Sequence, residues 1–437
     1  MRVERVAGAL GPIRKRAWRF AVGMAVVNCL VQGVFGQRSF TWPEIRDRFL
    51  AVNPTVLAGQ INVNESRAQE ITANLRPNPD FTLATDGTQL TPYQGVWRPF
   101  TGTQFSPTLS YLRERGGKRE LRLESAQKGT AVAQSQQADL ERTLLFNLHN
   151  AFVQALQAKA MLALAQENLA YYDQVLSVSG DRFRAGDIAQ VDLDRLQMQR
   201  IQYETDVQTG ITNVRTAKIQ VLALLNDRTP VEQFEVTGPF ENFAEPVLLL
   251  DEVHNMALAM RPDLRAAAQS IDKAQTDHRL AFANGAADIT LGSWWTHNPS
   301  FNNPYDHNTI GANVSIPIRI FDRNQGEKAR TELDIMRNQR LREANEAQVF
   351  SDVDSAYATL TGNMALLRRY KSTYLDQAAR VRDTVSFSYQ RGGASLLDFL
   401  NAQNDYRTVR LSYLNLIGSY MTAANQLNLA VGQEVIP

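Results

Sequence analysis

Residues 183–197 read FRAGDIAQVDLDRLQ, and residues 389–403 read YQRGGASLLDFLNAQ. In both stretches a glycine follows an aromatic residue by three positions, and an aspartate follows that glycine by six. The second stretch lies 206 residues after the first, from 183 to 389. A stretch that recurs in this way indicates an internal repeat.

Three further groups of landmarks recur in the same order, at distances of 208 to 210 residues. They are Asn53-Pro54-Thr55 with Arg261-Pro262-Asp263, Asp80-Phe81-Thr82-Leu83 with Asp288-Ile289-Thr290-Leu291, and Pro107, Gly116 and Lys118 with Pro317, Gly326 and Lys328. Four ordered landmarks with nearly constant spacing indicate that the whole chain behind its first residues is duplicated.

The duplication predicts two structural repeats behind an N-terminal leader. Each repeat is expected to hold short helices that begin at proline, then one β-hairpin, then long helices. The predicted bounds are 1–36 for the leader, 37–240 for the first repeat and 241–437 for the second. The hairpins are expected at about 80–112 and 288–321, and the long helices at 117–226 and 326–431.

The leader has the layout of a secretory signal peptide. A basic segment at 14–19 precedes an apolar run at 20–35, and the small residues Val34 and Gly36 suit a cleavage site. The run is shorter than the ~20 residues of a spanning helix, which disfavours the alternative of a membrane anchor. We therefore expect export with cleavage, and no membrane-spanning helix in the rest of the chain.

The composition disfavours nucleic-acid binders and most enzymes. The 46 Lys+Arg and 45 Asp+Glu residues leave a net charge of +1, whereas nucleic-acid-binding surfaces are basic. Cys29 is the single cysteine, and the five histidines have no metal-binding spacing. We therefore expect no catalytic residue, cofactor or metal site. A lipid on Cys29 stays open, although Asn28 stands where lipoproteins have a small residue.

A very long helix is predicted in each repeat. Residues 117–183 and 326–389 contain no proline and very few glycines. At ~1.5 Å per residue, such helices would extend about 100 Å and 95 Å. Helices of this length indicate a coiled coil, and the apolar spacing at 353–385 agrees with a coiled-coil seam. Gly186 and Gly392 supply the positive φ that turns each long helix back on a second one.

The hairpin segments alternate between apolar and polar residues, which indicates strands with one apolar face. Phe105, Leu109 and Tyr111 alternate with polar residues in the first hairpin, and apolar or small side chains alternate from Ile310 to Ile320 in the second. A soluble sheet with one face on a core and a barrel wall between lipid and water share this pattern. Both interpretations stay open on alternation alone.

Aromatic residues around the hairpins favour the barrel wall, because aromatic girdles mark the membrane interfaces of outer-membrane barrels. We expect five residues at such an interface: Trp97, Phe100, Trp294, Trp295 and Tyr305.

Four strands are too few to close a transmembrane barrel, since the smallest common ones have about eight. An open strand edge in lipid leaves unpaired backbone groups, at several kcal/mol each. Several copies would therefore share one barrel, and three copies would supply twelve strands. Helices of about 100 Å continuing from that barrel would form a tube across the periplasm, so the architecture predicts a conduit.

The ordered motifs resemble those of the TolC family of outer-membrane efflux proteins, over nearly all of the mature chain. The resemblance is carried by the duplicated layout, by the segments 261–264 and 317–322, and by the two glycine turns with their aspartates. The segment 115–119, RGGKR, is similar to the heavy-metal or cation branch of the family. The resemblance implies a mainly α fold with a small β part. It implies a homotrimer whose twelve-stranded outer-membrane β-barrel continues into a long α-helical coiled-coil barrel in the periplasm.

The resemblance also implies a function and partners. The chain would be the passive exit duct of a tripartite efflux pump in a Gram-negative-type cell, conducting small molecules or metal cations. Its partners would be a periplasmic adaptor (membrane fusion) protein, outer-membrane lipid and, indirectly, an inner-membrane pump of RND or ABC type. The alternatives are the channel of a type I protein secretion system and a periplasmic coiled-coil adaptor or scaffold.

Two sets of site residues carry over by position. The family closes its periplasmic end with an aspartate ring; Asp398 matches the first ring position, whereas Asn401 stands where a second aspartate can occur. A carboxylate in the first turn of a helix can equally be a cap, so ring and cap both stay open for Asp398. Asp192 faces the same choice, with the cap favoured. Adaptor docking is expected at the turn residues: Ala185, Gly186, Asp187, Arg391, Gly392 and Gly393.

Overall fold

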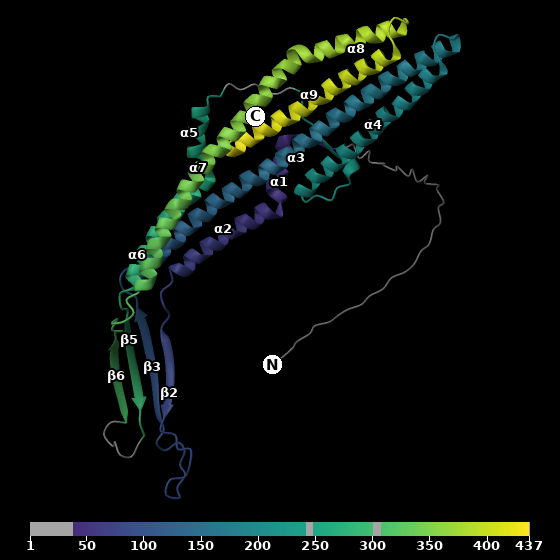
Figure 1. The fold of residues 1–437 in the computed structure, drawn as a ribbon. Coiled ribbons are helices and arrows are strands. Elements are labelled where there is room, and N and C mark those ends of the chain that lie inside the picture. The colour runs from purple at the N-terminus through teal and green to yellow at the C-terminus, as the bar shows by residue number, and fades with distance from the viewer. Residues whose placement is uncertain (1–37, 242–247, 300–306, 437) are drawn as a thin grey trace, which may run out of the picture. The chain divides into compact units, whose positions relative to one another are not determined.

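The computed structural model of the chain describes residues 38–241, 248–299 and 307–436 (Figure 1). The predicted signal peptide at 1–36 and the predicted interface residue Tyr305 lie outside the described residues. Among the described helices, none combines the length and the apolar character needed to cross a membrane.

The elements of the first half recur in the second half in the same order. The first half holds α1 (Trp42–Val52), α2 (Pro54–Ala73), β2 (Asp80–Asp86), β3 (Gln104–Arg113), α3 (Lys118–Ala185) and α4 (Gln190–Leu224). The second half holds α5 (Leu250–Met260), α6 (Pro262–Asn284), β5 (Ile289–His297), β6 (Asn308–Ser315), α7 (Gln325–Arg369), α8 (Leu375–Gln390) and α9 (Leu396–Val431). The predicted duplication and the mainly α fold are confirmed, and the exact repeat bounds stay a proposal.

The start of α2 shows how local sequence sets a helix end. Pro54 occupies the first helical position, where its missing N–H costs nothing. The Asn53 side-chain oxygen accepts hydrogen bonds from the amides of Thr55 (2.9 Å) and Val56 (3.2 Å). Its side-chain nitrogen donates to the carbonyl oxygen of Leu224 (2.9 Å), which ties the start of α2 to the end of α4.

The second long helix differs from its prediction as one continuous helix over 326–389. A π-helical turn, Tyr370–Tyr374, separates α7 from α8. The ring of Tyr370 packs edge-on against Tyr374, with centroids 5.3 Å apart, and stacks on Tyr413 of α9 at 6.5 Å. The spacing of apolar residues along one helix does not reveal such ring contacts between helices, so the sequence did not predict the π-helical turn. Helix α3, by contrast, runs through 68 residues without such a turn.

The long helices lie side by side and form a wall (Figure 1). Next to the sheet, the order of neighbours is α2, α3, α6 and α7; toward the glycine turns it is α4, α3 and α9, followed by α7 and α8. Helix α3 therefore takes part in both ends of the wall, and each glycine turn joins a neighbouring pair of helices, as the coiled-coil prediction required.

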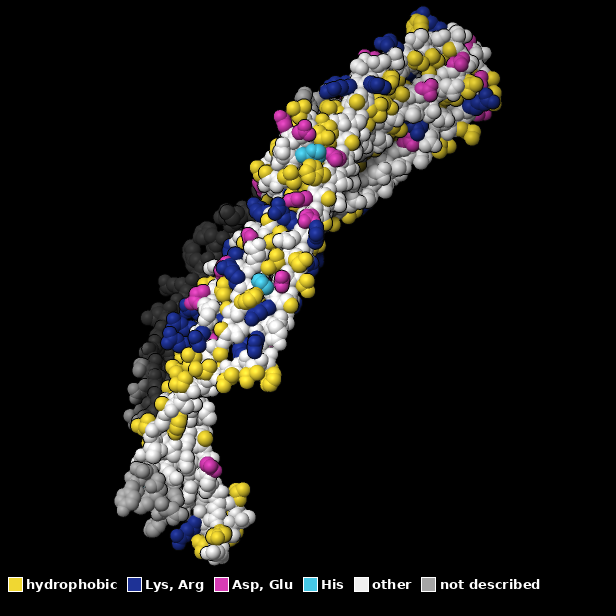
Figure 2. All heavy atoms as spheres, turned by 60° about the vertical axis from the view of Figure 1, so that its left-hand side comes forward, with side chains coloured by type: hydrophobic (Ala, Val, Ile, Leu, Met, Phe, Trp, Pro, Cys, Tyr) yellow, Lys and Arg dark blue, Asp and Glu magenta, His cyan; other side chains and the backbone are white. Residues whose placement is uncertain are grey.

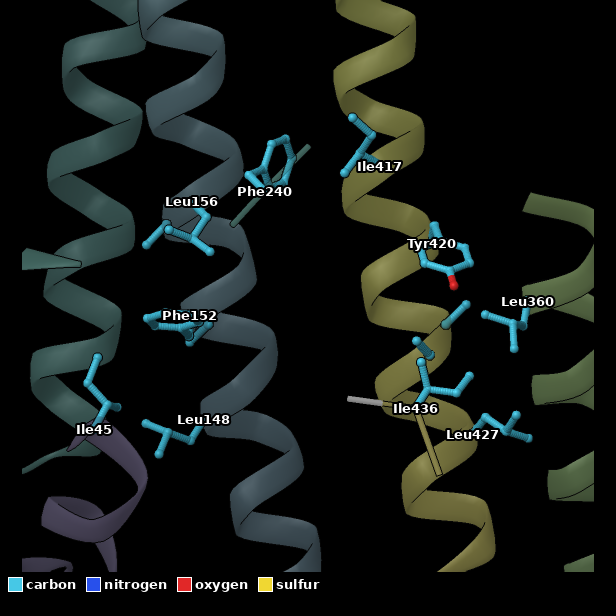
Figure 3. Close-up of a cluster of buried hydrophobic side chains, with 14 of the residues drawn as sticks. Ile45, Leu148, Phe152, Leu156, Phe240, Leu360, Ile417, Tyr420, Leu427 and Ile436 are labelled. Carbon is cyan, nitrogen blue, oxygen red and sulfur yellow. The ribbon is translucent and has the colours of Figure 1, made fainter. Parts of the chain in front are cut away.

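The apolar core gathers side chains of short elements and of the long helices, as Figure 3 shows for part of it. Ile45 of α1 and Phe152 of α3 belong to it, together with Leu360 of α7 and Leu427 of α9. A short parallel pair of strands, β1 (Arg38–Phe40) and β4 (Phe234–Val236), adds the buried Phe234 and Val236. No strand was predicted in either place, because three residues are too few to show an alternating pattern.

The four hairpin strands form one antiparallel sheet in the order β2–β3–β5–β6. Within the described part of the chain, β2 and β6 each have a neighbour on one side only. Strand β6 ends at Ser315, although the alternating pattern predicted a strand as far as Ile320. Ser315 pairs with Thr290, and β5 begins at Ile289, so the residues after Ser315 have almost no neighbouring strand to pair with.

Candidate functional site

The register of the sheet separates an apolar face from a polar one. Leu109 lies opposite Phe81 of β2 and Ser293 of β5, and Ile310 lies opposite Trp295, so these residues share a face. The apolar side chains of this face are Phe81, Leu83, Phe105, Leu109, Tyr111, Ile289, Leu291, Trp295, Ile310 and Val314. Leu109 is 53% exposed and Ile310 is 85% exposed. Such an apolar surface marks a contact with another protein or with a membrane.

The opposite face of the sheet is polar. Its polar side chains are Asp80, Thr82, Asp86, Gln104, Ser106, Thr108, Ser110, Thr290, Thr296, Thr309, Asn313 and Ser315. An outward apolar face and an inward polar face are the pattern of a wall between lipid and a water-filled lumen.

The register places two of the predicted interface residues, Trp294 and Trp295, on opposite faces of the sheet. Successive strand residues face opposite sides, so Trp295 lies on the apolar face and Trp294 on the polar one. Trp294 lies opposite Gly311, where an added Cβ atom would come within 2.2 Å of the indole ring. Trp294 therefore lies on the face opposite to that of Trp295, and its place at a membrane interface stays a prediction. Trp97 and Phe100, in the loop between β2 and β3, are exposed (61% and 75%) and stay predicted interface residues together with Trp295.

At the start of α9, Asp398 takes part in a capping box. Its carboxylate oxygen Oδ2 accepts hydrogen bonds from the hydroxyl (2.7 Å) and the amide (3.2 Å) of Ser395, and its own amide donates to the Ser395 hydroxyl (3.1 Å). The bonds from Ser395 hold the pKa of the Asp398 carboxyl below its ordinary value. In the described chain the other oxygen, Oδ1, accepts no hydrogen bond, so the cap leaves it available and the ring stays a prediction.

Asp192 has a different environment from Asp398. The residue that corresponds to Ser395 is Ala189, which has no side chain able to cap α4. Asp192 instead lies 3.8 Å from Arg195 in a partly exposed ion pair. Within the described residues, the Asp192 carboxylate accepts no hydrogen bond from the first amides of α4. It therefore stabilises the helix N-terminus only through its negative charge.

Asn401 lies on the same exposed side of α9 as Asp398, three residues further on. Asp405 continues this exposed stripe seven residues after Asp398, or about two helical turns. Asp405 was not among the predicted site residues, although its spacing of seven residues from Asp398 could have indicated it. The stripe therefore carries two carboxylates with an amide between them.

The two glycine turns are held together by contacts between the halves. Arg182 donates to the carbonyl oxygen of Tyr389 (2.9 Å), and its guanidinium lies 5.3 Å from the centre of the Tyr389 ring. A second apolar cluster behind the turns consists of Tyr172, Val175, Leu196, Tyr203, Tyr389 and Phe399. The six predicted docking residues, 185–187 and 391–393, are all exposed. They form the turn surface, which has the glycines at 186 and 392 in left-handed conformation (φ 85° and 77°).

Metal ligands do not cluster in the described residues: no group of three or more His, Cys, Asp or Glu side chains is placed to hold an ion. His297 Nδ1 lies 2.9 Å from the side-chain oxygen of Asn308, and His307 Nδ1 lies 3.1 Å from the carbonyl oxygen of Asn298. Both rings therefore take part in hydrogen bonds of the β5–β6 hairpin.

A sheet with an exposed apolar face and two open edges, joined to helices as long as α3, defines an outer-membrane channel protein. The sequence profile of the outer membrane efflux protein family matches residues 45–227 and 253–433. The chain belongs to this family.

Curated relatives are similar over most of their length. The chain is 23% identical to the cobalt-zinc-cadmium resistance protein CzcC of Cupriavidus metallidurans, over 83% of this chain and 82% of CzcC. It is 24% identical to the pyoverdine export outer membrane protein OpmQ of Pseudomonas aeruginosa, over 74% of this chain and 68% of OpmQ.

Solved structures share the fold. CusC matches with a TM-score of 0.75 and 18% identity, over 91% of this chain and 94% of CusC. The Campylobacter jejuni CmeC outer membrane channel matches with a TM-score of 0.74 and 14% identity, over 90% of this chain and 86% of CmeC. The predicted family, fold and outer-membrane location are confirmed, and the chain is an efflux duct that extends from the outer membrane into the periplasm.

Proposed function

We propose that three copies of the chain form one passive duct, which receives solutes from a tripartite pump and releases them outside the cell. The sheet carries this proposal, with its exposed apolar face and its unpaired edges at β2 and β6. Unpaired backbone groups in lipid are unfavourable by several kcal/mol each. Pairing β2 of one copy with β6 of the next removes every edge, and twelve strands are enough to close a barrel.

The turn surface is our proposed docking site for a periplasmic adaptor. Its residues are exposed, and the Arg182–Tyr389 contact holds both turns in one surface. It lies at the opposite end of the long helices from the sheet (Figure 1), where an adaptor could connect the duct to an inner-membrane pump of RND or ABC type. The type I secretion channel remains the alternative assignment of the same duct.

The stripe of Asp398, Asn401 and Asp405 on α9 is our proposed selectivity ring. Three copies of Asp398 near a symmetry axis would attract cations and repel anions. The capping bonds support this role, because they fix the carboxylate and favour its charged form. Asp192, paired with Arg195, is assigned outside the ring.

Metal cations are the proposed cargo. The similarity to CzcC, whose name records cobalt, zinc and cadmium resistance, supports this choice, and the OpmQ similarity keeps small organic molecules as the alternative. An outer-membrane duct conducts what its pump delivers, so the cargo is tested in cells. Expression in a strain that lacks its own duct, together with a cognate pump and adaptor, should restore growth in cobalt, zinc or cadmium salts. Restored export of organic compounds with unchanged metal sensitivity would contradict the metal assignment.

The duct itself is tested by planar-bilayer recording of the purified protein. We expect discrete channels that multivalent cations block from the periplasmic side, and a weaker block for Asp398→Ala. Asp376→Ala is the matched control, since Asp376 is an exposed aspartate on α8. Equal block in wild type and Asp398→Ala would exclude the ring, and the absence of any conductance would exclude the duct.

A further inference from the structure

The apolar face of β3 changes character toward the helices. Leu109, Tyr111 and Arg113 follow one another on this face, because alternate strand residues share a side. The order from aliphatic to aromatic to cationic side chain matches the order from acyl chain to interface to headgroup in one leaflet. Figure 2 shows Lys and Arg side chains on the helical side of the junction with the sheet, close to a group of hydrophobic ones.

A cleft of about 460 Å³ opens at this junction. Three segments line it: the linker after α2, the end of β3 and the first turn of α3. Arg76, Tyr111 and Arg113 contribute side chains from the first two segments, and Lys118 and Arg119 from the third. The cleft thus combines one aromatic ring with four cationic side chains.

Two of these four cations already have acidic partners. The nearly buried Lys118 contacts Asp288 (2.7 Å) and the carbonyl oxygen of Ala286 (2.8 Å). Arg119 pairs with Glu120 (2.9 Å). The remaining acid of the cleft, Glu114, is held by both terminal nitrogens of Arg122. The acids of the cleft are therefore neutralised.

Arg76 and Arg113 differ from the other two cations. Both are exposed, and neither guanidinium group makes a hydrogen bond or an ion pair with any residue that the structure describes. Two unpaired guanidinium groups lining one cleft suit an anion with several oxygens, because arginine binds phosphate through paired N–H groups.

We propose that Arg76 and Arg113 bind the phosphate of a glycerophospholipid headgroup in the periplasmic leaflet of the outer membrane. The inference rests on the proposed function, since it requires the apolar face of the sheet to lie in lipid. In that position the acyl chains lie along Leu109 and Phe81, and Tyr111 lies at the interface. The contact fixes the depth of the barrel in the membrane and makes the duct selective for lipids that carry a phosphate.

The test uses the purified full-length protein in detergent and measures its binding to three probes. These probes are phosphatidylglycerol, diacylglycerol with the same acyl chains, and inorganic phosphate. We expect phosphatidylglycerol to bind and to raise the melting temperature more than diacylglycerol does, with no effect of millimolar inorganic phosphate. The double variant Arg76→Gln/Arg113→Gln should lose about tenfold or more in affinity for phosphatidylglycerol, because two charged hydrogen-bond donors are removed. Arg380→Gln, an exposed arginine on α8, is the matched control.

Unchanged phosphatidylglycerol affinity in the double variant would overturn the proposal, as would equal binding of diacylglycerol by the wild type. Stabilisation by inorganic phosphate alone would identify a free anion as the ligand and also overturn it. Arg76→Lys/Arg113→Lys keeps both charges and should retain part of the selectivity, which guards against a folding defect in the glutamine variant. Trimer formation and conductance are measured on the same samples, so a failed duct is distinguished from a failed lipid site.

Discussion

Leu109→Arg tests which face of the sheet meets lipid. Leu109 lies near the middle of β3, opposite Phe81 and Ser293, and 53% of it is exposed in the single chain. An arginine on the lipid face near the midplane destabilises a barrel by about 2–4 kcal/mol. Three equivalent sites in one trimer would then lose roughly 6–12 kcal/mol if they act independently. We expect almost no assembled trimer.

The matched control is Thr108→Arg, one residue earlier on the polar face. Thr108 lies opposite Thr82 and Trp294, so its arginine would project into the lumen, where charge is tolerated. The assay compares the amount of SDS-resistant trimer in washed outer membranes and the temperature at which it dissociates. Equal yields for the two variants, or a larger loss for Thr108→Arg, would refute the assignment of the faces.

Three further predictions concern single contacts. Asn53→Ala removes the cap of α2 and the bond to α4, and chemical denaturation should show a loss of about 1–2 kcal/mol; no loss would contradict the capping argument. Gly311→Ala places a Cβ atom against the Trp294 ring and should lower the melting temperature of the trimer, and Trp294→Ala in the same chain should restore part of it. Since the hydrogen bonds from Ser395 hold the pKa of the Asp398 carboxyl below its ordinary value of about 3.9, cation block should persist as the pH falls from 7 past that ordinary value and weaken only at lower pH. The contribution of Asp398 to the free energy of unfolding has the same pH dependence. It is present above the pKa of the unfolded state and is lost as the pH falls through the lowered pKa of the folded state. A cation block that disappears already near pH 6 would contradict this reasoning.

The helices were predictable because their ends depend on local residues. Pro54 and Pro262 begin α2 and α6, and Gly186 and Gly392 lie at the turns that end α3 and α8. These residues act through their own φ angles, which no distant contact has to support. The duplication then supplied a second observation of the short helices, the hairpin and the long helices.

Features that depend on distant partners were not predictable in the same way. The end of β6 at Ser315 depends on where β5 begins, and the π-helical turn comes with ring packing between Tyr370 and Tyr413. The different environments of Asp192 and Asp398 could have been predicted from the sequence, since Ser395 has a side chain that can complete a capping box and Ala189 has none. Strand alternation also predicts that Trp294 and Trp295 lie on opposite faces of the sheet. The interface prediction grouped them together because they are adjacent in the sequence.

Disulfide trapping between β2 and β6 of different copies tests the shared barrel most directly. In a Cys29→Ser background, Thr82→Cys on β2 is combined in turn with Thr309→Cys, Asn313→Cys and Ser315→Cys on β6, all on the polar face. Adjacent strands lie about 4.8 Å apart, within the reach of a disulfide. We predict that at least one pairing gives covalent dimers and trimers on a denaturing gel after oxidation in the outer membrane. Monomers alone at every pairing, from a protein that is present and folded, would contradict the shared barrel.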